Sequence, residues 1–244
     1  MATPSTDDIL TENLQTVQGR IADACRRAGR APDGVTLVAV TKTVDPGVIR
    51  ALADLGVRHV GENRVQQLLD RADDLADLDL AWHMIGHLQR NKVRKVLPRV
   101  ALVHSVDSLR LAEAIDRVAG EADGAADALL EVNVAGEAAK FGFTPADLDH
   151  AVESLGRLTH LRVRGLMTMA PFVDDAETVR PVFASLRDLA ARLGRSAPPN
   201  VSMGELSMGM TQDYVQAVEE GATIVRVGTA LFRGLPPPPA AAGG

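Results

Sequence analysis

Lys42 is the residue whose chemistry stands out first in this sequence. The chain of 244 residues has 26 lysines and arginines, but few of them are lysines. The lysines are Lys42, Lys92, Lys95 and Lys140. A lysine amine whose pKa is lowered by burial can form an imine with an aldehyde, whereas the guanidinium group of arginine stays protonated and cannot. Lys42 is therefore a candidate for imine chemistry. The simpler alternative is a lysine that extends toward solvent from a strand end.

The residues around Lys42 place it at the end of a strand. Val35 to Val40 is a short apolar run rich in β-branched residues, which predicts a buried strand. Asp45 and Pro46 are typical of the N-cap and the first position of a helix. Lys42 is therefore expected at the carboxyl end of a strand, just before a helix, where parallel α/β proteins bind ligands.

Two glycine-containing segments near the end of the chain could bind an anion. The first is Leu-Ser-Met-Gly-Met-Thr at 206–211, and the second is Gly228 with Thr229. Glycines, hydroxyl groups and helix starts leave backbone N–H groups free to bind phosphate. In (β/α)8 barrels, the phosphate site often lies in the loops after strands seven and eight. These two segments are expected to be those loops, which makes a phosphate site the stronger hypothesis when an amine lies on the first strand.

Arg226 is a charged residue inside the apolar run 223–227, Thr-Ile-Val-Arg-Val. A buried guanidinium group needs a partner. A carboxylate elsewhere in the fold is one candidate, and a ring nitrogen of a ligand is another. A pyridine nitrogen that accepts a hydrogen bond from arginine stays neutral. The ring is then a poorer electron sink than a pyridinium paired with a carboxylate.

Asn63 follows the second predicted strand, in the segment Gly-Glu-Asn-Arg at 61–64. Its side chain could cap the next helix or reach a ligand at the rim of the sheet. Glu62 and Arg64 are expected to form a local ion pair. Met167 and Met169, near the end of the sixth predicted strand, are expected to fill gaps in the core, although a flat ring could also pack against them.

The histidines near the third and fourth predicted strands do not form a metal or catalytic motif. His83 and His87 are four residues apart, but no glutamate separates them and the segment is expected to be strand and turn. No metal site is predicted, and His87 is expected to line the rim at most. His104 and Asp107 are too close in sequence for a Ser-His-Asp triad, so Asp107 is expected to cap a helix.

Two further segments have weaker functional signals. The basic segment 89–95 is expected to be a solvated helix face. The loop from Gly136 to Gly142 contains Lys140 and could form a lid over the mouth of a barrel.

Hydrophobic periodicity predicts strands and helices that alternate behind one N-terminal helix. That helix, 6–29, has an apolar stripe, with Thr6 as its cap and Gly29 at its end. The predicted strands are 35–41, 58–61, 81–85, 101–104, 127–133, 161–166, 200–203 and 223–227. The predicted helices are 46–56, 63–76, 90–97, 108–121, 145–156, 175–194, 212–220 and 229–233. Eight strand–helix units predict a (β/α)8 barrel with an extra N-terminal helix. A doubly wound open sheet is the alternative.

Composition narrows the class of protein. We expect a single barrel domain, 1–235, followed by a tail rich in Pro, Ala and Gly, 236–244. The net charge of −6 argues against a nucleic-acid partner. No apolar run is long enough to span a membrane, and the N-terminus lacks the features of a signal peptide. Cys25 is the only cysteine and is expected in the core. Because one cysteine cannot form an internal disulfide, a cytoplasmic location is favoured.

Together these segments resemble the YggS/PROSC family of pyridoxal phosphate homeostasis proteins, which have an alanine-racemase-like barrel. The resemblance covers the chain apart from the tail. It rests on Val-Ala-Val-Thr-Lys at 38–42, Gly-Glu-Asn at 61–63, Trp-His-Met-Ile-Gly-His-Leu-Gln-Arg-Asn-Lys at 82–92, Gly-Leu-Met-Thr-Met-Ala at 165–170, Leu-Ser-Met-Gly-Met-Thr at 206–211 and Val-Arg-Val-Gly-Thr-Ala-Leu-Phe at 225–232. One departure is Arg233, which precedes Gly234 where the family usually has Gly directly after the Phe.

The resemblance implies a site. Lys42 would hold pyridoxal 5′-phosphate (PLP) as an internal aldimine, Arg226 would face the pyridine nitrogen, and Asn63 would lie near the cofactor. The residues implied to bind the phosphate, largely through backbone N–H groups, are Ser207, Met208, Gly228 and Thr229.

The resemblance also implies a function. The protein would bind PLP and keep its supply balanced, with apo forms of PLP-dependent enzymes as partners and no defined turnover reaction. The alternative is an amino-acid racemase, which needs an acid/base group on each face of the ring. Lys42 could be one such group. The other, a tyrosine from a second domain of a partner subunit, has no evident counterpart, because the only tyrosine is Tyr214 in a predicted helix. A carrier does not need a dimer to complete its site, so a monomer is expected.

Overall fold

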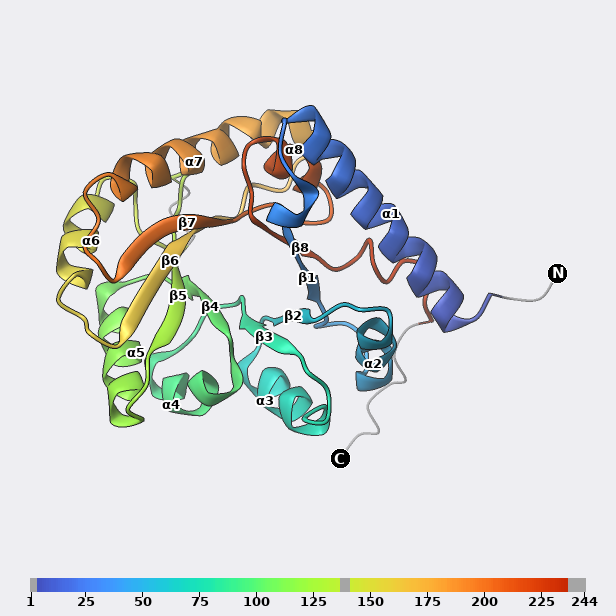
Figure 1. Ribbon diagram of the computed structural model, residues 1–244, viewed down its shortest axis with the longest axis horizontal. Coiled ribbons are helices and arrows are strands. Elements are labelled where there is room, and N and C mark those ends of the chain that lie inside the picture. The colour runs from blue at the N-terminus through green and yellow to red at the C-terminus, as the bar shows by residue number, and fades with distance from the viewer. Residues whose placement is uncertain (1–3, 137–140, 237–244) are drawn as a thin grey trace.

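The computed structural model describes residues 4–136 and 141–236. Its centre is a closed barrel of parallel strands in the order β1 to β8. The strands are β1 (Thr36–Val40), β2 (His59–Glu62), β3 (Ala81–Met84), β4 (Leu102–Val106), β5 (Ala126–Glu131), β6 (Leu161–Met167), β7 (Val201–Ser207) and β8 (Ile224–Val227). Helices cover the outside of the strands (Figure 1). The predicted (β/α)8 barrel is confirmed, and the open sheet is excluded because β1 pairs with β8.

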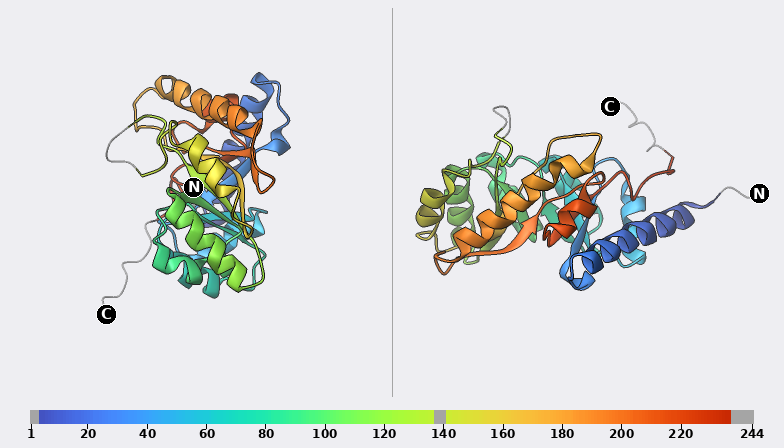
Figure 2. Two further views of the ribbon diagram at one scale, coloured as in Figure 1. Left: turned by 90° about the vertical axis from the view of Figure 1, so that its left-hand side faces the viewer. Right: turned by 90° about the horizontal axis from the view of Figure 1, so that it is seen from above.

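The helices lie where the sequence pattern predicts them, with small shifts at their ends. They are α1 (Thr6–Arg27), α2 (Pro46–Asp54), α3 (Val65–Asp74), α4 (Val93–Val96), α5 (Leu109–Glu121), α6 (Leu148–Leu155), α7 (Arg180–Gly194) and α8 (Tyr214–Glu219). Short 3-10 turns occupy Pro32–Gly34, Arg90–Lys92, Leu97–Arg99 and Ala176–Val179. Helix α1 lies along the outside of the barrel against α8 (Figure 2).

The start of α1 differs from the prediction. Ser5, rather than Thr6, is the N-cap, because its hydroxyl accepts from the Asp8 N–H while the Asp8 carboxylate accepts from the Ser5 N–H. The end agrees with the prediction: α1 stops at Arg27, and Gly29 has a φ of 65°, which glycine adopts without strain.

The predicted helix at 229–233 is wrong. Residues 229–231 form a turn in which the Leu231 N–H donates to the Gly228 carbonyl at 2.9 Å. The Asn13 amide of α1 donates to the Leu231 and Arg233 carbonyls, at 3.0 and 2.9 Å. These bonds tie the chain after β8 to α1 and leave no continuous helical pattern.

Two apolar clusters hold the barrel together. The larger one lies between strands and helices and includes Cys25, which is fully buried as predicted. The smaller one contains only strand residues, as expected for the interior of a barrel, and consists of Val38, Leu102, Leu129, Met167 and Ile224. In the described part of the chain, no helix is long and apolar enough to cross a membrane.

Parallel pairing sets the position of the site. Val38 lies opposite Arg226 and Ala39 opposite Val227, so the ends of β1 and β8 are level. Lys42 follows β1 by two residues, and Gly228 follows β8 directly. All eight carboxyl ends meet at one end of the barrel, which brings Lys42 and Gly228 to the same rim. Lys140 and the tail after Pro236 lie outside the described residues, so the expected lid and the domain boundary at 235 stay predictions.

Candidate functional site

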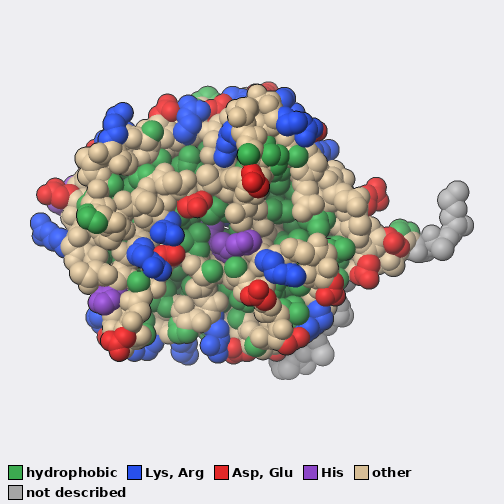
Figure 3. All heavy atoms as spheres, viewed as in Figure 1, with side chains coloured by type: hydrophobic (Ala, Val, Ile, Leu, Met, Phe, Trp, Pro, Cys, Tyr) green, Lys and Arg blue, Asp and Glu red, His purple; other side chains and the backbone are tan. Residues whose placement is uncertain are grey.

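A pocket of about 650 Å³ opens at the carboxyl ends of the strands. Five of the seven residues expected to bind the cofactor line it: Lys42, Asn63, Arg226, Gly228 and Thr229. The face drawn in Figure 3 is hollowed near its centre, with histidine and hydrophobic side chains around the hollow. Ser207 and Met208 do not line the pocket, because both are fully buried behind its wall.

Lys42 is exposed, and the backbone segment that carries it is fixed by hydrogen bonds. The Gln67 amide of α3 donates to the Lys42 carbonyl at 3.0 Å. The preceding Thr41 is fully buried, and its hydroxyl donates to Glu62 Oε1 at 2.5 Å. The backbone that carries Lys42 is therefore fixed, while its amine is free to meet a ligand in the pocket.

A buried ion pair between Arg71 and Glu62 also fixes the segment that carries Lys42. The Arg71 guanidinium contacts the Glu62 carboxylate and donates to the Thr41 carbonyl at 2.7 Å and to the Val44 carbonyl. Burial raises the pKa of Glu62, while the Thr41 hydrogen bond and the Arg71 charge oppose that rise. The expected Glu62–Arg64 pair is wrong, because Glu62 points inward and reaches α3 instead of its sequence neighbour.

Arg226 lies in the wall of the pocket with 4 % of its surface exposed. Its Nη1 donates to Ser207 Oγ at 2.5 Å, and its Nη2 donates to the Thr168 carbonyl at 2.9 Å. Burial lowers the pKa of Arg226 to about 10, and the charges of Asp213 and Glu131 oppose this. The guanidinium group therefore stays protonated at neutral pH and can only donate toward the pocket.

A chain of hydrogen bonds runs from Arg226 across the barrel interior. Ser207 Oγ lies 2.8 Å from His104 Nδ1, and His104 Nε2 lies 2.8 Å from His83 Nδ1. His83 Nε2 lies 3.0 Å from His59 Nδ1. Sequence spacing does not predict these contacts, because each histidine comes from a different strand.

The histidines of this chain share one tautomer. A neutral imidazole carries one N–H, so a ring that donates to one neighbour accepts from the other. Arg226 donates to Ser207 Oγ, which keeps its own proton and one further lone pair for the contact with His104 Nδ1. Burial lowers the pKa of His83 to about 3 and lowers that of His104 as well, so both rings are neutral at pH 7.

The loops after β7 and β8 offer donors to an anion. Four pocket-lining residues have backbone N–H groups that donate no hydrogen bond to any described residue: Thr211, Gln212, Gly228 and Thr229. The Met208 N–H, by contrast, donates to the Ile224 carbonyl at 3.1 Å. The predicted phosphate segments are thus present at the rim, but the donors after β7 come from 211–212 rather than from 207–208.

Other lining residues carried little signal in the sequence. Glu131, at the end of β5, has a pKa raised by burial and by the charge of Asp107. Met169 and Phe172 are exposed and line the pocket, although Met169 was expected in the core. His87 lines the rim as expected.

The expected cap at Asp107 is wrong. Ser108 is the N-cap of α5, since its hydroxyl accepts from the Leu111 N–H, while Asp107 pairs with His87 Nδ1 at 3.1 Å. In the part of the chain that the structure describes, no group of three or more His, Cys, Asp or Glu side chains could hold a metal ion.

Comparison with known proteins places this barrel in a class. Residues 13–236 match the protein family described as alanine racemase, N-terminal domain. The sequence is 46 % identical over 221 residues to the pyridoxal phosphate homeostasis protein of Aquifex aeolicus. The matched region covers 91 % of this chain and 96 % of that protein. The chain belongs to the family of pyridoxal phosphate homeostasis proteins.

Solved structures agree with this assignment. An unknown protein from Bifidobacterium adolescentis superimposes with a TM-score of 0.88 at 40 % identity, over 95 % of this chain and 98 % of that one. PipY of Synechococcus elongatus, solved with PLP bound, gives a TM-score of 0.77 at 41 % identity, over 87 % and 99 %. The family name describes homeostasis of a cofactor and no reaction, as the resemblance in the sequence implied.

Proposed function

We propose that this protein binds PLP in the pocket at the carboxyl end of the barrel and acts as a carrier that balances its supply. The observation that supports this most is the meeting of three different groups in one cavity. They are a lysine amine, a buried arginine and a set of unused backbone N–H groups. PLP has an aldehyde, a pyridine nitrogen and a phosphate, so each group has a counterpart.

The residues present fit this cofactor. Lys42 is proposed to bond the aldehyde carbon through its amine, with loss of water. The phosphate is proposed to lie against the N–H groups of Gly228 and Thr229 and of Thr211 and Gln212. Ser207 and Met208 would support that wall from behind, and Asn63 would contact the cofactor from the β2 side.

Arg226 explains why a carrier is favoured over an enzyme. When bound, PLP supplies an electron sink that stabilises a carbanion, and the sink is stronger when the ring nitrogen is protonated. Arg226 stays protonated and only donates, so a ring nitrogen facing it must accept and remain neutral. The site is therefore suited to hold the cofactor with little catalysis.

An amino-acid racemase is the second candidate, because Glu131 places a carboxyl group in the pocket. Its raised pKa would allow it to move a proton. Tyr214 cannot take this role, since it is 2 % exposed and lies outside the pocket.

A hydrogen-exchange experiment separates these two functions. The PLP-loaded protein is incubated with D- and L-alanine in deuterated water, beside an alanine racemase and the E131Q variant. The carrier function predicts α-proton loss near the background of free PLP in both proteins, together with transfer of PLP to an apo-enzyme. Loss on the order of 1 s⁻¹ or faster that disappears in E131Q would contradict it.

Further features of the carrier are part of the same proposal. Recipients would be apo forms of PLP-dependent enzymes. The protein would act as a cytoplasmic monomer, because a carrier, unlike a racemase, needs no residue from a partner subunit to complete its site. Residues 1–235 would form the single functional domain.

A further inference from the structure

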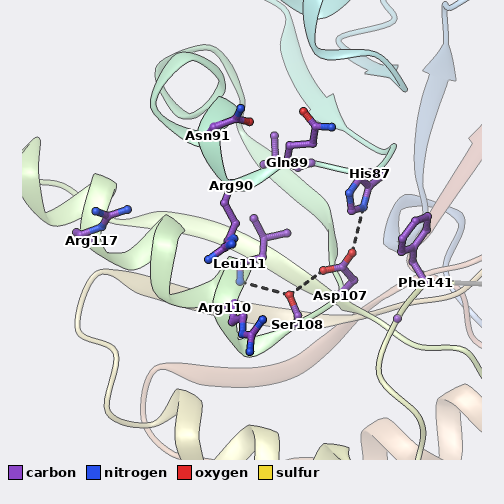
Figure 4. A pocket seen from close by; sticks show the side chains of 12 residues that line it. His87, Gln89, Arg90, Asn91, Asp107, Ser108, Arg110, Leu111, Arg117 and Phe141 are labelled. Carbon is purple, nitrogen blue, oxygen red and sulfur yellow. Dashed lines mark hydrogen bonds and ion pairs between the residues drawn. The ribbon is translucent and has the colours of Figure 1, made fainter.

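A second cavity of about 970 Å³ adjoins the pocket just described. It lies between the loop after β3 and the start of α5 (Figure 4). His87 and Phe141 line both cavities, so they form the wall between them. The rings of these two residues are stacked, with centroids 4.4 Å apart and an interplanar angle of 22°.

Three arginines line the second cavity: Arg90, Arg110 and Arg117. Arg90 points from its loop toward α5, where Arg110 lies, and Arg117 lies further along the helix (Figure 4). Arg110 and Arg117 are seven residues apart, which places them on one face of α5, about 10 Å apart along its axis. The cavity thus has cationic groups on two of its sides.

These arginines have no partner among the residues 4–136 and 141–236. Their neighbours behave differently: Arg94 pairs with Glu121, and Arg99 pairs with Asp73. In a chain with a net charge of −6, three unpaired guanidinium groups around one cavity form an unusual concentration of positive charge.

The acidic residue that lines the cavity is already engaged. Asp107 lines the cavity but pairs with His87 at 3.1 Å and accepts from the Ser108 hydroxyl at 3.0 Å. Gln89 and Asn91 add amide donors to the lining. The cavity therefore offers donors and positive charge, which are what phosphate groups bind, and a stacked aromatic wall on one side.

We propose that this second cavity binds an aromatic phosphate ester and holds it beside the main pocket, on its way in or out. The inference rests on the proposed function, since PLP is such an ester. The phosphate is bound by the guanidinium groups of Arg90, Arg110 and Arg117, and the ring packs against Phe141. In this second cavity the ligand is bound without a covalent bond, next to the pocket in which Lys42 is proposed to bond it.

The test uses protein whose main pocket is blocked. PLP-loaded protein is reduced with borohydride, which makes the bond to lysine permanent, and mass spectrometry verifies the modified residue. Calorimetry then measures binding of pyridoxine 5′-phosphate, which lacks an aldehyde. Pyridoxine and inorganic phosphate, used separately, report the contributions of ring and phosphate.

The double variant R110Q/R117Q should weaken binding of pyridoxine 5′-phosphate to the reduced protein by about tenfold or more, because charged hydrogen bonds are lost. The control is R157Q, which removes another exposed arginine without a partner in the described chain and outside both cavities. It should leave affinity within about twofold, as expected for a distant charge screened by salt. Circular dichroism checks that each variant is folded.

The possible outcomes separate this inference from the proposed function. One equivalent bound to the reduced protein, lost in R110Q/R117Q and kept in R157Q, supports the second site. No binding to the reduced protein, or equal loss in both variants, overturns it. Equal affinity for inorganic phosphate overturns the assignment to an aromatic ester. A reduced cofactor found away from Lys42 contradicts the proposed function instead.

Discussion

Arg226 Nη1 lies 2.5 Å from Ser207 Oγ, and this contact links Arg226 to a chain of buried histidines. The Ser207 hydroxyl also contacts His104, and the neutral histidine rings behind it share one tautomer. The group expected to face the pyridine nitrogen is thus held by a chain of neutral hydrogen bonds rather than by a carboxylate.

Ser207→Ala should destabilise the fold by about 1–3 kcal/mol, because it leaves the Arg226 donor and His104 Nδ1 without this partner in a buried site. Urea unfolding measures this change. Ser202→Ala is the matched control, since the Ser202 hydroxyl bonds the Arg164 carbonyl at an exposed site. Equal losses of unfolding free energy in the two variants would show that the hydrogen bonds of Ser207 contribute little to the stability of the fold.

Stability should fall as the pH drops from about 6.5, the ordinary pKa of histidine, toward 3. Burial lowers the pKa of His83 to about 3 and holds the pKa of His104 well below its ordinary value, so the unfolded chain binds protons that the folded chain does not. Each histidine contributes up to about 1.4 kcal/mol per pH unit within this window.

The measurement is the free energy of unfolding in urea between pH 7 and pH 5. His83→Asn should give a shallower dependence than the wild type, while His150→Asn, at an exposed residue, should not. An unchanged slope in His83→Asn would mean that His83 is not held neutral.

Arg71→Met should cost about 3–5 kcal/mol, because it leaves the fully buried Glu62 carboxylate without its charge partner. It should also loosen the segment that carries Lys42 and slow PLP attachment. Arg50→Met, which breaks the exposed pair with Asp77, should leave the free energy of unfolding almost unchanged. Urea unfolding and the rate of PLP attachment are the two readouts. Similar values for both variants would contradict the claim that the Arg71–Glu62 pair fixes the segment that carries Lys42.

Gly228→Val should weaken binding of PLP more than Thr229→Ala does. A Cβ at Gly228 would lie 3.2 Å from the Val40 carbonyl oxygen, so the branched side chain must displace the rim or enter the pocket. Thr229→Ala keeps the backbone N–H and removes one hydroxyl. Titration with PLP and with pyridoxal measures the effect, and Gly228→Val should bring the two affinities closer together. An unchanged preference for the phosphorylated form would show that this backbone does not bind the phosphate.

The sequence predicted the barrel and most of the pocket because both depend on local patterns. A short apolar run followed by a helix cap placed Lys42 at the rim, and glycine segments marked the loops after β7 and β8. These features need only the period of the elements and the parallel order of the strands.

Pairings across the barrel could not be predicted in this way. Glu62 was expected to pair with the nearby Arg64 but reaches Arg71 one helix away, and His83 meets His104 from the next strand. Such contacts depend on which face of each strand points inward, and a shift of one residue reverses it. The helix expected at 229–233 failed for a related reason, since Asn13 from the other end of the chain holds that segment.

The most direct test of the central claim is to locate the cofactor on the chain. Freshly purified protein is loaded with PLP, its visible spectrum is recorded, and it is reduced with borohydride before peptide mass spectrometry. We expect a yellow protein whose absorption band is lost on reduction, with the label on Lys42. Lys42→Ala should abolish the label, and Lys92→Ala should keep it. A label on another lysine of the fresh wild-type protein, or an undiminished label in Lys42→Ala, would contradict the claim.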